Sequence, residues 1–193
     1  SIPQCPPSWF SDNSTRTCTQ TCNATVGYIA YTPTRMCVLV CINNTYSHQG
    51  ACISACPNTT APFYYIDLTT ISCVTTCPDY YFKDNIQGKC VLANGCSQGY
   101  YADYSLSTCV LECNSTLYVY KDDTTMQCVD QCPFGTFGDH SNMTIKFCRI
   151  DCPSSWYQDN STWTCVQTCP TYPSYYADTH LGKCLDRCRV EVD

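Results

Sequence analysis

The spacing of the cysteines constrains this chain more than any other feature. The cysteines lie at positions 5, 18, 22, 37, 41, 52, 56, 73, 77, 90, 96, 109, 113, 128, 132, 148, 152, 165, 169, 184 and 188. Gaps of 10 to 16 residues alternate with gaps of three, except for the five residues between Cys90 and Cys96. The ten long gaps define ten modules of similar length.

The modules repeat in sequence as well as in spacing. The stretch CPPSWFSDNSTRTCTQTC at 5–22 returns 147 residues later as CPSSWYQDNSTWTCVQTC at 152–169, with 13 of 18 positions identical. We therefore expect 1–193 to form one tandem array, in which 188–193 begins a further module or forms a C-terminal tail. The expected modules are 5–18, 22–37, 41–52, 56–73, 77–90, 96–109, 113–128, 132–148, 152–165 and 169–184.

The cysteine content also indicates a compartment. Twenty-one cysteines in 193 residues exceed the level typical of disulfide scaffolds, and such thiols stay oxidised only outside the cytosol. We expect a secreted or extracellular protein at the cell surface, present here as mature or internal sequence. The net charge of −6 offers no basic surface for nucleic acid, and no run reaches the ~18 apolar residues that membrane insertion needs.

Each module has a recurring interior. Proline follows the opening cysteine in six modules, an aromatic residue lies five positions after that cysteine, and an aspartate lies seven after it in five modules. These pairs are Phe10/Asp12, Phe82/Asp84, Tyr101/Asp103, Phe137/Asp139 and Tyr157/Asp159. We expect the ring to lie against the disulfide of its module and the aspartate to begin a turn by hydrogen-bonding its own backbone. The aliphatic residue after the closing cysteine should pack against the neighbouring module.

No stretch has helical periodicity, and arms of three to five residues between turn formers favour short strands. The predicted fold class is small and disulfide-rich. It is an elongated rod of about ten tandem single-disulfide, hairpin-like modules, with short β arms, irregular loops and essentially no α-helix.

The spacing leaves two disulfide registers open. In the first, each long gap is closed by its own flanking cysteines, which leaves Cys188 over. In the second, neighbouring short pairs interlock, for example Cys18 with Cys37 and Cys22 with Cys41, which leaves Cys5 over.

The pattern C-P-x-x-aromatic-aromatic-x-D…C-V-x-x-C, over 5–188, resembles the furin-like, growth-factor-receptor cysteine-rich repeats. It is similar in style to cysteine-periodic surface proteins of the ciliate type. The simplest module of that family has one disulfide that closes a bow-shaped loop, so the resemblance implies the first register. The implied pairs are Cys5–Cys18, Cys22–Cys37, Cys41–Cys52, Cys56–Cys73, Cys77–Cys90, Cys96–Cys109, Cys113–Cys128, Cys132–Cys148, Cys152–Cys165 and Cys169–Cys184. Cys188 would then open an eleventh module, or remain a free or intermolecular thiol.

Seven N-x-S/T sequons require surface exposure in a secreted protein, and we expect covalent N-linked glycans on them. The sequons begin at Asn13, Asn23, Asn43, Asn58, Asn114, Asn142 and Asn160.

No residue pattern indicates a catalytic or cofactor-binding site. The three histidines are scattered through different modules, and the short cysteine gaps do not have the spacing of a zinc site. Asp122, Asp123 and Asp139 lack the calcium-loop pattern and are expected to be solvated turn carboxylates. We therefore expect no metal, no cofactor and no enzymatic activity.

Exposed rings are the remaining candidates for function, since tyrosine and tryptophan are enriched at interfaces. They are Trp9, Trp156, Trp163, Tyr64, Tyr65, Tyr80, Tyr81, Tyr175 and Tyr176. The favoured hypothesis is a glycosylated structural protein of an extracellular fibre or cell-surface coat, which forms a homo-oligomer or filament with copies of itself. The alternative is a receptor ectodomain stalk or surface antigen that binds a protein ligand.

Overall fold

The structure, a computed structural model, describes residues 5–113, 116–117, 119–142, 146–171 and 174–187. The chain divides into two compact units, Ser1–Cys90 and Val91–Asp193. The division falls at the five-residue bridge that interrupts the regular cysteine spacing. Each unit is described below by itself.

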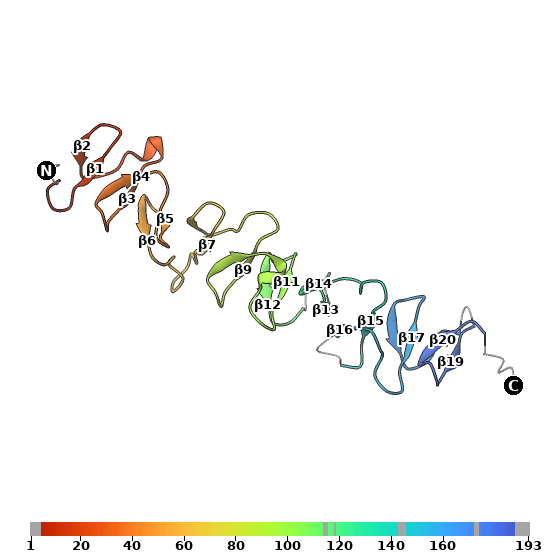
Figure 1. Cartoon of the computed structure of the whole chain (residues 1–193). Helices are drawn as coiled ribbons and strands as arrows, with labels where there is room; N and C mark the ends of the chain where they lie inside the picture. The colour runs from red at the N-terminus through yellow and green to blue at the C-terminus, as the bar shows by residue number, and fades with distance from the viewer. Residues whose placement is uncertain (1–4, 114–115, 118, 143–145, 172–173, 188–193) are drawn as a thin grey trace. The chain divides into compact units, whose positions relative to one another are not determined.

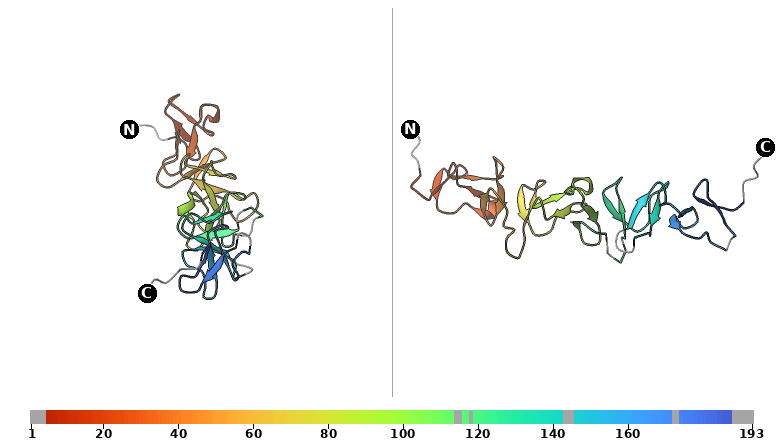
Figure 2. Two further views of the ribbon diagram at one scale, coloured as in Figure 1. Left: turned by 90° about the vertical axis from the view of Figure 1, so that its right-hand side faces the viewer. Right: turned by 90° about the horizontal axis from the view of Figure 1, so that it is seen from below.

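Both units consist of short β-hairpins that follow one another in chain order, as Figures 1 and 2 show. The strands of the first unit are β1 (Phe10–Asp12), β2 (Thr17–Thr19), β3 (Ile29–Tyr31), β4 (Met36–Val38), β5 (Tyr46–His48), β6 (Ala51–Ile53), β7 (Tyr65–Asp67), β8 (Ser72–Val74), β9 (Phe82–Asp84) and β10 (Lys89–Val91, whose last residue belongs to the second unit). Those of the second are β11 (Tyr101–Asp103), β12 (Thr108–Val110), β13 (Tyr120–Asp122), β14 (Gln127–Val129), β15 (Phe137–Asp139), β16 (Lys146–Arg149), β17 (Tyr157–Asp159), β18 (Thr164–Val166), β19 (Tyr176–Asp178) and β20 (Lys183–Leu185).

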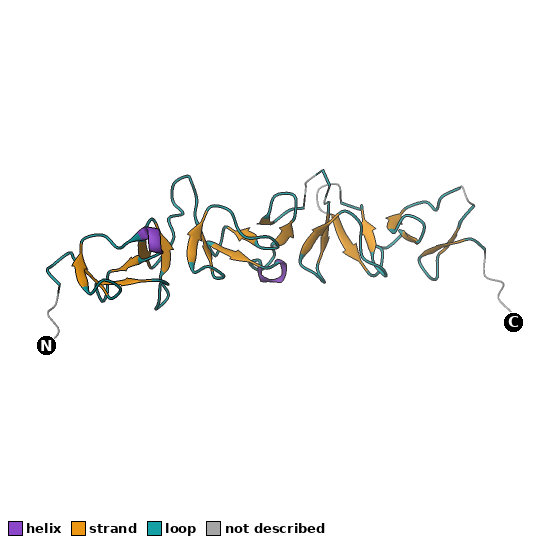
Figure 3. Cartoon of the chain, turned by 90° about the horizontal axis from the view of Figure 1, so that it is seen from above, coloured by secondary structure: helices purple, strands orange, loops and turns teal. Residues whose placement is uncertain are grey.

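Two single-turn 3-10 helices, η1 (Ala24–Val26) and η2 (Ala93–Gly95), are the helical segments of the described residues (Figure 3). The scarcity of helix follows from the sequence, because no segment has an apolar stripe at helical spacing.

One disulfide closes each hairpin, and its closing cysteine lies within the second strand. The disulfides join Cys5–Cys18, Cys22–Cys37, Cys41–Cys52, Cys56–Cys73, Cys77–Cys90, Cys96–Cys109, Cys113–Cys128, Cys132–Cys148, Cys152–Cys165 and Cys169–Cys184. These are the pairs of the first register. Cys188 lies outside the described residues.

Neighbouring hairpins are joined by a pairing that the sequence analysis did not anticipate. The first strand of a hairpin pairs antiparallel with its own second strand and parallel with the second strand of the next hairpin. The parallel pairs are β1–β4, β3–β6, β5–β8 and β7–β10 in the first unit, and β11–β14, β13–β16, β15–β18 and β17–β20 in the second. Antiparallel and parallel contacts therefore alternate through each unit, and each hairpin contacts mainly its neighbours.

The core of each unit is built from cystines and rings rather than from aliphatic side chains. Tyr101 is 7% exposed and packs with the cystine Cys113–Cys128 of the following hairpin, with Val110 beside it. In the first unit Tyr31 packs in the same way on Cys41 and Cys52. The expectation that a ring covers the disulfide of its own module was therefore wrong at Tyr101. The ring covers the next cystine because the parallel pairing brings the following hairpin against the first strand.

The structure thus confirms a small disulfide-rich fold of tandem hairpins with short strands.

Candidate functional site: turns, module contacts and sequons

An aspartate at the end of the first strand shapes the turn of most hairpins. The Oδ1 atom of Asp159 accepts hydrogen bonds from the backbone N (2.9 Å) and the hydroxyl (2.6 Å) of Ser161, and its Oδ2 accepts one from the hydroxyl of Thr162 (2.8 Å). Bonds from the backbone N two residues on recur at Asp12, Asp67, Asp84, Asp103, Asp122, Asp139 and Asp178. The predicted aspartate turn is confirmed.

The carboxylates of Asp122 and Asp139 are not solvated, however. Asp122 is 1% exposed and Asp139 is 4% exposed, which corrects the expectation that both lie in solvated turns. Burial is tolerated because the turn supplies several hydrogen bonds to each carboxylate.

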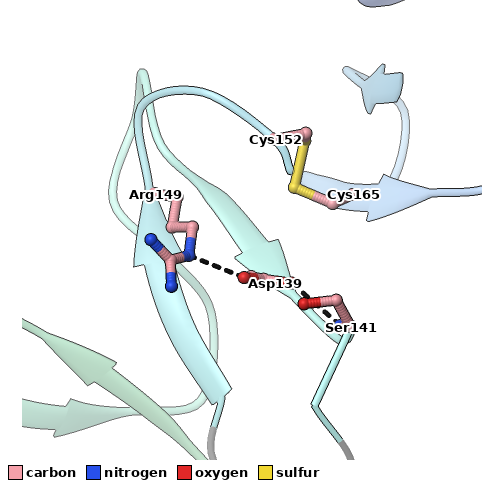
Figure 4. A network of polar contacts seen from close by, with 5 residues as sticks. All are labelled: Asp139, Ser141, Arg149, Cys152 and Cys165. Atoms are coloured by element: carbon pink, nitrogen blue, oxygen red, sulfur yellow. Dashed lines mark hydrogen bonds and ion pairs between the residues drawn. A yellow bond between two sulfur atoms is a disulfide. The ribbon is translucent and has the colours of Figure 1, made fainter. Parts of the chain in front are cut away.

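Asp139 has an additional cationic partner. Its carboxylate lies between the backbone N of Ser141, 2.8 Å from Oδ1, and the Nε of Arg149, 2.6 Å from Oδ2 (Figure 4). Burial by itself raises the pKa of Asp139, but the bonds from Ser141 and the charge of Arg149 outweigh it and lower the pKa below its ordinary value. Asp139 therefore stays ionised at neutral pH.

Three tyrosines at the start of a first strand reach into the following module. Each hydroxyl contacts the residue directly after the turn aspartate there. The pairs are Tyr65 with Asn85 (2.6 Å), Tyr101 with Asp123 (2.5 Å) and Tyr120 with His140 (2.5 Å). Burial raises the pKa of the Tyr101 and Tyr120 phenols, and at Tyr101 the hydrogen bond to Asp123 raises it further. Both hydroxyls therefore stay protonated at neutral pH.

The rings of the same tyrosines lie against the middle residue of the next first strand. The Nζ of Lys83 lies 5.7 Å from the Tyr65 ring centre, and the Nζ of Lys121 lies 5.3 Å from that of Tyr101. These are cation–π contacts. At the third site the middle residue is Gly138, where an added Cβ would lie 2.6 Å from Cε1 of Tyr120. Only glycine lets that ring approach the strand so closely.

The residue two positions before the closing cysteine forms the other half of the module contact. At Trp163 and at the six residues named below, it has a positive φ, and its carbonyl accepts a hydrogen bond from the middle residue of the preceding first strand. Trp163, with φ 54°, accepts from the N of Gly138 at 2.8 Å. Equivalent acceptors are Arg35, Gly50, Ile71, Gly88, Met126 and Gly182. The left-handed backbone turns the carbonyl toward the neighbour, even where a side chain makes that conformation costly.

The side chain at this position also reaches the preceding module. Trp163 lies against Phe137 (ring centres 5.8 Å apart) and Phe134 (5.2 Å). Arg35 donates from Nη1 to the carbonyl oxygen of Cys5 at 3.3 Å. Sequence reasoning missed this position because its residue types share no chemistry; the constant distance from the closing cysteine was the available signal.

All sequon asparagines that the structure describes lie at the surface, namely Asn13, Asn23, Asn43, Asn58, Asn142 and Asn160. Asn114 lies outside the described residues. Two of these amides take part in local structure. The Oδ1 of Asn23 accepts from the backbone N of Thr25 at the start of η1, and the Nδ2 of Asn43 donates to the hydroxyl of Tyr31 at 2.9 Å. Glycosylation leaves Nδ2 one hydrogen, so both contacts are compatible with an attached sugar.

Two surface grooves each contain a sequon asparagine. A groove of about 400 Å³ is lined by Asn58, Phe63 and Tyr65 among others, and a groove of about 510 Å³ is lined by residues that include Asn160 and Trp163. Sequence analysis placed these asparagines at the surface but could not place them beside rings.

Most rings expected at the surface are partly buried instead. Tyr80 (77%) and Tyr176 (51%) are exposed, whereas Trp9, Trp156, Trp163, Tyr64, Tyr65, Tyr81 and Tyr175 are half-buried. Among the described residues, the most exposed large apolar side chain is that of Phe134, at 91%. It was not anticipated because it occupies no recurring position in the module.

Within the described part of the chain, no group of three or more histidine, cysteine, aspartate or glutamate side chains is arranged to hold a metal ion. Among the same residues, no helix has the length and apolar character needed to cross a membrane.

Comparison of the chain with models of protein families, with curated proteins and with solved structures found no match. The class of protein therefore rests on the architecture. Ten tandem disulfides at regular spacing define a cysteine-rich repeat protein. So many disulfides are typical of a secreted, extracellular protein.

Proposed function

We propose that this chain is a glycosylated structural protein of an extracellular fibre or cell-surface coat, whose modules, within one chain or between copies, join through the same contact that joins its hairpins. The proposal assigns the chain no catalytic reaction. The sequons support the coat, because N-linked sugar would cover much of the surface.

The observation that carries the proposal is a tripeptide that occurs in two environments. Tyr-Ala-Asp forms both β11, at 101–103, and β19, at 176–178. In β11 the next hairpin covers the strand, so Tyr101 is 7% exposed and Ala102 is 0% exposed. In β19 Tyr176 is 51% exposed, and Ala177 is exposed as well. Among the described residues no hairpin covers the outer edge of β19, so this edge presents the surface that a following hairpin, of the same chain or of another copy, would cover.

A complementary acceptor lies directly before β2. Arg16, two positions before the closing Cys18, has the positive φ (56°) of the acceptor residues in the other modules. The N–H of Ala177 in one copy could therefore bond to the Arg16 carbonyl of a second copy, as the N–H of Ala102 bonds to the Met126 carbonyl at 2.9 Å. Such a head-to-tail contact between copies uses two different surfaces, so it generates open filaments unless the rotation from copy to copy closes a ring.

The test is the assembly state of the secreted, glycosylated chain. Negative-stain images and sedimentation velocity over a range of concentrations should show polymers longer than one copy. Ala177→Pro removes the edge N–H and should leave monomers, whereas the matched control Ala177→Ser keeps the N–H and should polymerise. Monomers of the unchanged protein at all concentrations, together with capture of a specific protein ligand, would instead favour a receptor stalk or surface antigen.

A further inference from the structure

The groove around Asn160 has exposed apolar side chains along its surface. Phe134 is 91% exposed and Ile150 is 72% exposed, and both line the groove with Trp163. Clustered exposed apolar side chains mark binding surfaces more often than single ones do. The groove volume of about 510 Å³ lies within the ~300–1,000 Å³ of small-ligand sites.

The rings of this groove are held in place from two sides. The carbonyl of Trp163 accepts a hydrogen bond from the N–H of Gly138 in β15, the first strand of the preceding hairpin. The Trp163 ring stacks on the buried Phe137 at an interplanar angle of 25°. Phe134 adds a second ring, tilted by 53° to Trp163. Polar groups of Asp151 and Lys183 also line the groove. An apolar platform bordered by polar groups suits a ligand with one C–H face and several hydroxyls.

Asn160, whose sequon lies three residues before Trp163, belongs to the same groove. Its turn is fixed by the bonds from Ser161 and Thr162 to the buried Asp159. We propose that the first sugars of an N-linked glycan on Asn160 lie in this groove against Trp163 and Phe134, so that carbohydrate covers the platform. This inference rests on the glycosylation that is part of the proposed function.

Tethering makes even a weak stacking contact sufficient. A glycan joined to Asn160 is held beside the rings at an effective concentration in the millimolar range. A pyranose presents C–H groups on one face, which suit the electron-rich face of an aromatic ring. Its hydroxyl and acetamide groups can meet the polar groups at the border of the groove.

The groove around Asn58 repeats this combination in the first unit. It is lined by Phe63, which is 51% exposed, and by the ring of Tyr65. The Nδ2 of Asn58 lies 3.5 Å from the position that a Cβ on Gly88 would take. The same combination of a sequon and exposed rings therefore recurs in a different module.

The duplication supplies a matched control at Asn13. Residues 12–17 read DNSTRT and residues 159–164 read DNSTWT, so the two sequons share the turn and differ only in Arg16 against Trp163. A glycan at Asn13 has no ring at this position. Asn13→Gln removes a glycan from the same turn and should leave the groove unchanged.

The experiment is hydroxyl-radical footprinting of the secreted glycoprotein, read residue by residue by mass spectrometry, before and after enzymatic removal of N-glycans. Oxidation of Phe134 should rise about twofold, because a sugar that covers one face of a ring leaves about half of it accessible. Oxidation of Trp163 should rise at least as much, because Phe137 already covers its other face. Asn160→Gln should give the same rise. Asn13→Gln should not, and Tyr80 should react at one rate in all samples.

Three results would overturn the inference, and they are distinguishable. If glycopeptide analysis finds Asn160 unmodified, the glycan coat of the proposed function also fails at this position. If Asn160 carries a glycan and the oxidation rates do not change, only the placement in the groove fails. If protection depends on protein concentration and not on the glycan, a second copy occupies the groove.

Discussion

The carboxylate of Asp103 lacks a hydrogen bond that its counterparts have. Its Oδ2 is buried without a partner among the described residues. In the equivalent turns, Oδ2 of Asp67, Asp122 and Asp159 accepts from a threonine hydroxyl three residues on. The residue at that position after Asp103 is Leu106, which has no hydroxyl and is 55% exposed.

Leu106→Thr should therefore stabilise the second unit. The new hydroxyl would satisfy a buried carboxylate oxygen, which should add about 1 kcal/mol to the free energy of unfolding. Guanidinium unfolding of the oxidised protein measures the change. Leu106→Val has nearly the same shape without the hydroxyl, so it should give no gain; an equal gain in both variants would show that loss of the exposed leucine is responsible.

The turn aspartates also predict how stability depends on pH. Burial raises the pKa of Asp67 and Asp159, but hydrogen bonds from the following threonine and serine residues outweigh it and leave each pKa below the ordinary 3.8. A carboxyl whose pKa is lower in the folded state contributes stability above its unfolded pKa and loses it as pH falls through the folded value. The melting temperature should be flat from pH 7 to about pH 5 and fall below about pH 4. Calorimetry that shows no loss down to pH 2 would contradict this role.

The sequence predicted these turns for a simple reason. An aspartate at a fixed distance from a cysteine bonds residues two and three positions on, so the interaction is local and visible in the chain. The burial of Asp122 and Asp139 could not be predicted from the sequence, because residues outside each turn contribute to covering its carboxylate. For the same reason the pattern could not show that Phe134 and Asn160 line one groove.

At the scale of the element, the contact between Tyr120 and Gly138 shows how closely two hairpins fit. The Tyr120 ring occupies the space that a side chain on β15 would need. Gly138→Ala should therefore displace the ring, weaken its hydroxyl contact with His140, and lower the free energy of unfolding by about 1–3 kcal/mol. Thermal unfolding gives the stability, and the His140 resonances in NMR spectra report the lost contact.

A double-mutant cycle separates this clash from any intrinsic effect of alanine in the strand. Tyr120→Ala removes the ring and is itself costly. In that background, however, Gly138→Ala should cost almost nothing, and the two changes should be strongly non-additive. Additive costs would show that the strand, and not the ring, requires glycine.

The hairpins could be predicted from the sequence, but their parallel pairing could not. The disulfide between a cysteine before the first strand and a cysteine within the second strand determines which two strands form a hairpin. The parallel contacts between Ser11 of β1 and Arg35 before β4, and between Gly138 of β15 and Trp163 before β18, each include a hydrogen bond from a backbone N–H to a backbone carbonyl. Arginine, isoleucine and tryptophan all serve as acceptor residues, so no residue type marks the contact.

At the scale of the whole molecule, the two units contain complete sets of disulfides. Five pairs lie within 1–90 and five within 91–187. We expect each segment, produced separately in an oxidising compartment, to form its own five native disulfides. Peptide mapping without reduction measures the pairing, and hydrogen exchange measures whether the strands are protected.

Reduction supplies the control for the same experiment. Each disulfide closes a loop and lowers the entropy of the unfolded state, which stabilises the fold by roughly 3 kcal/mol. Each unit has few buried aliphatic side chains that could replace this stabilisation after reduction. Both segments should lose protection when reduced. Mixed pairings in one segment would mean that it needs the other to fold.

The uniform contact between successive hairpins has a consequence for inheritance. Since each hairpin within a unit meets the next through bonds between main-chain atoms, excision or insertion of one whole repeat there brings together strand edges whose main-chain groups already match. Recombination between the similar repeats would thus change the number of hairpins in a unit and keep these main-chain bonds, whereas a tyrosine placed like Tyr120 would still need a glycine placed like Gly138 in the hairpin that follows it.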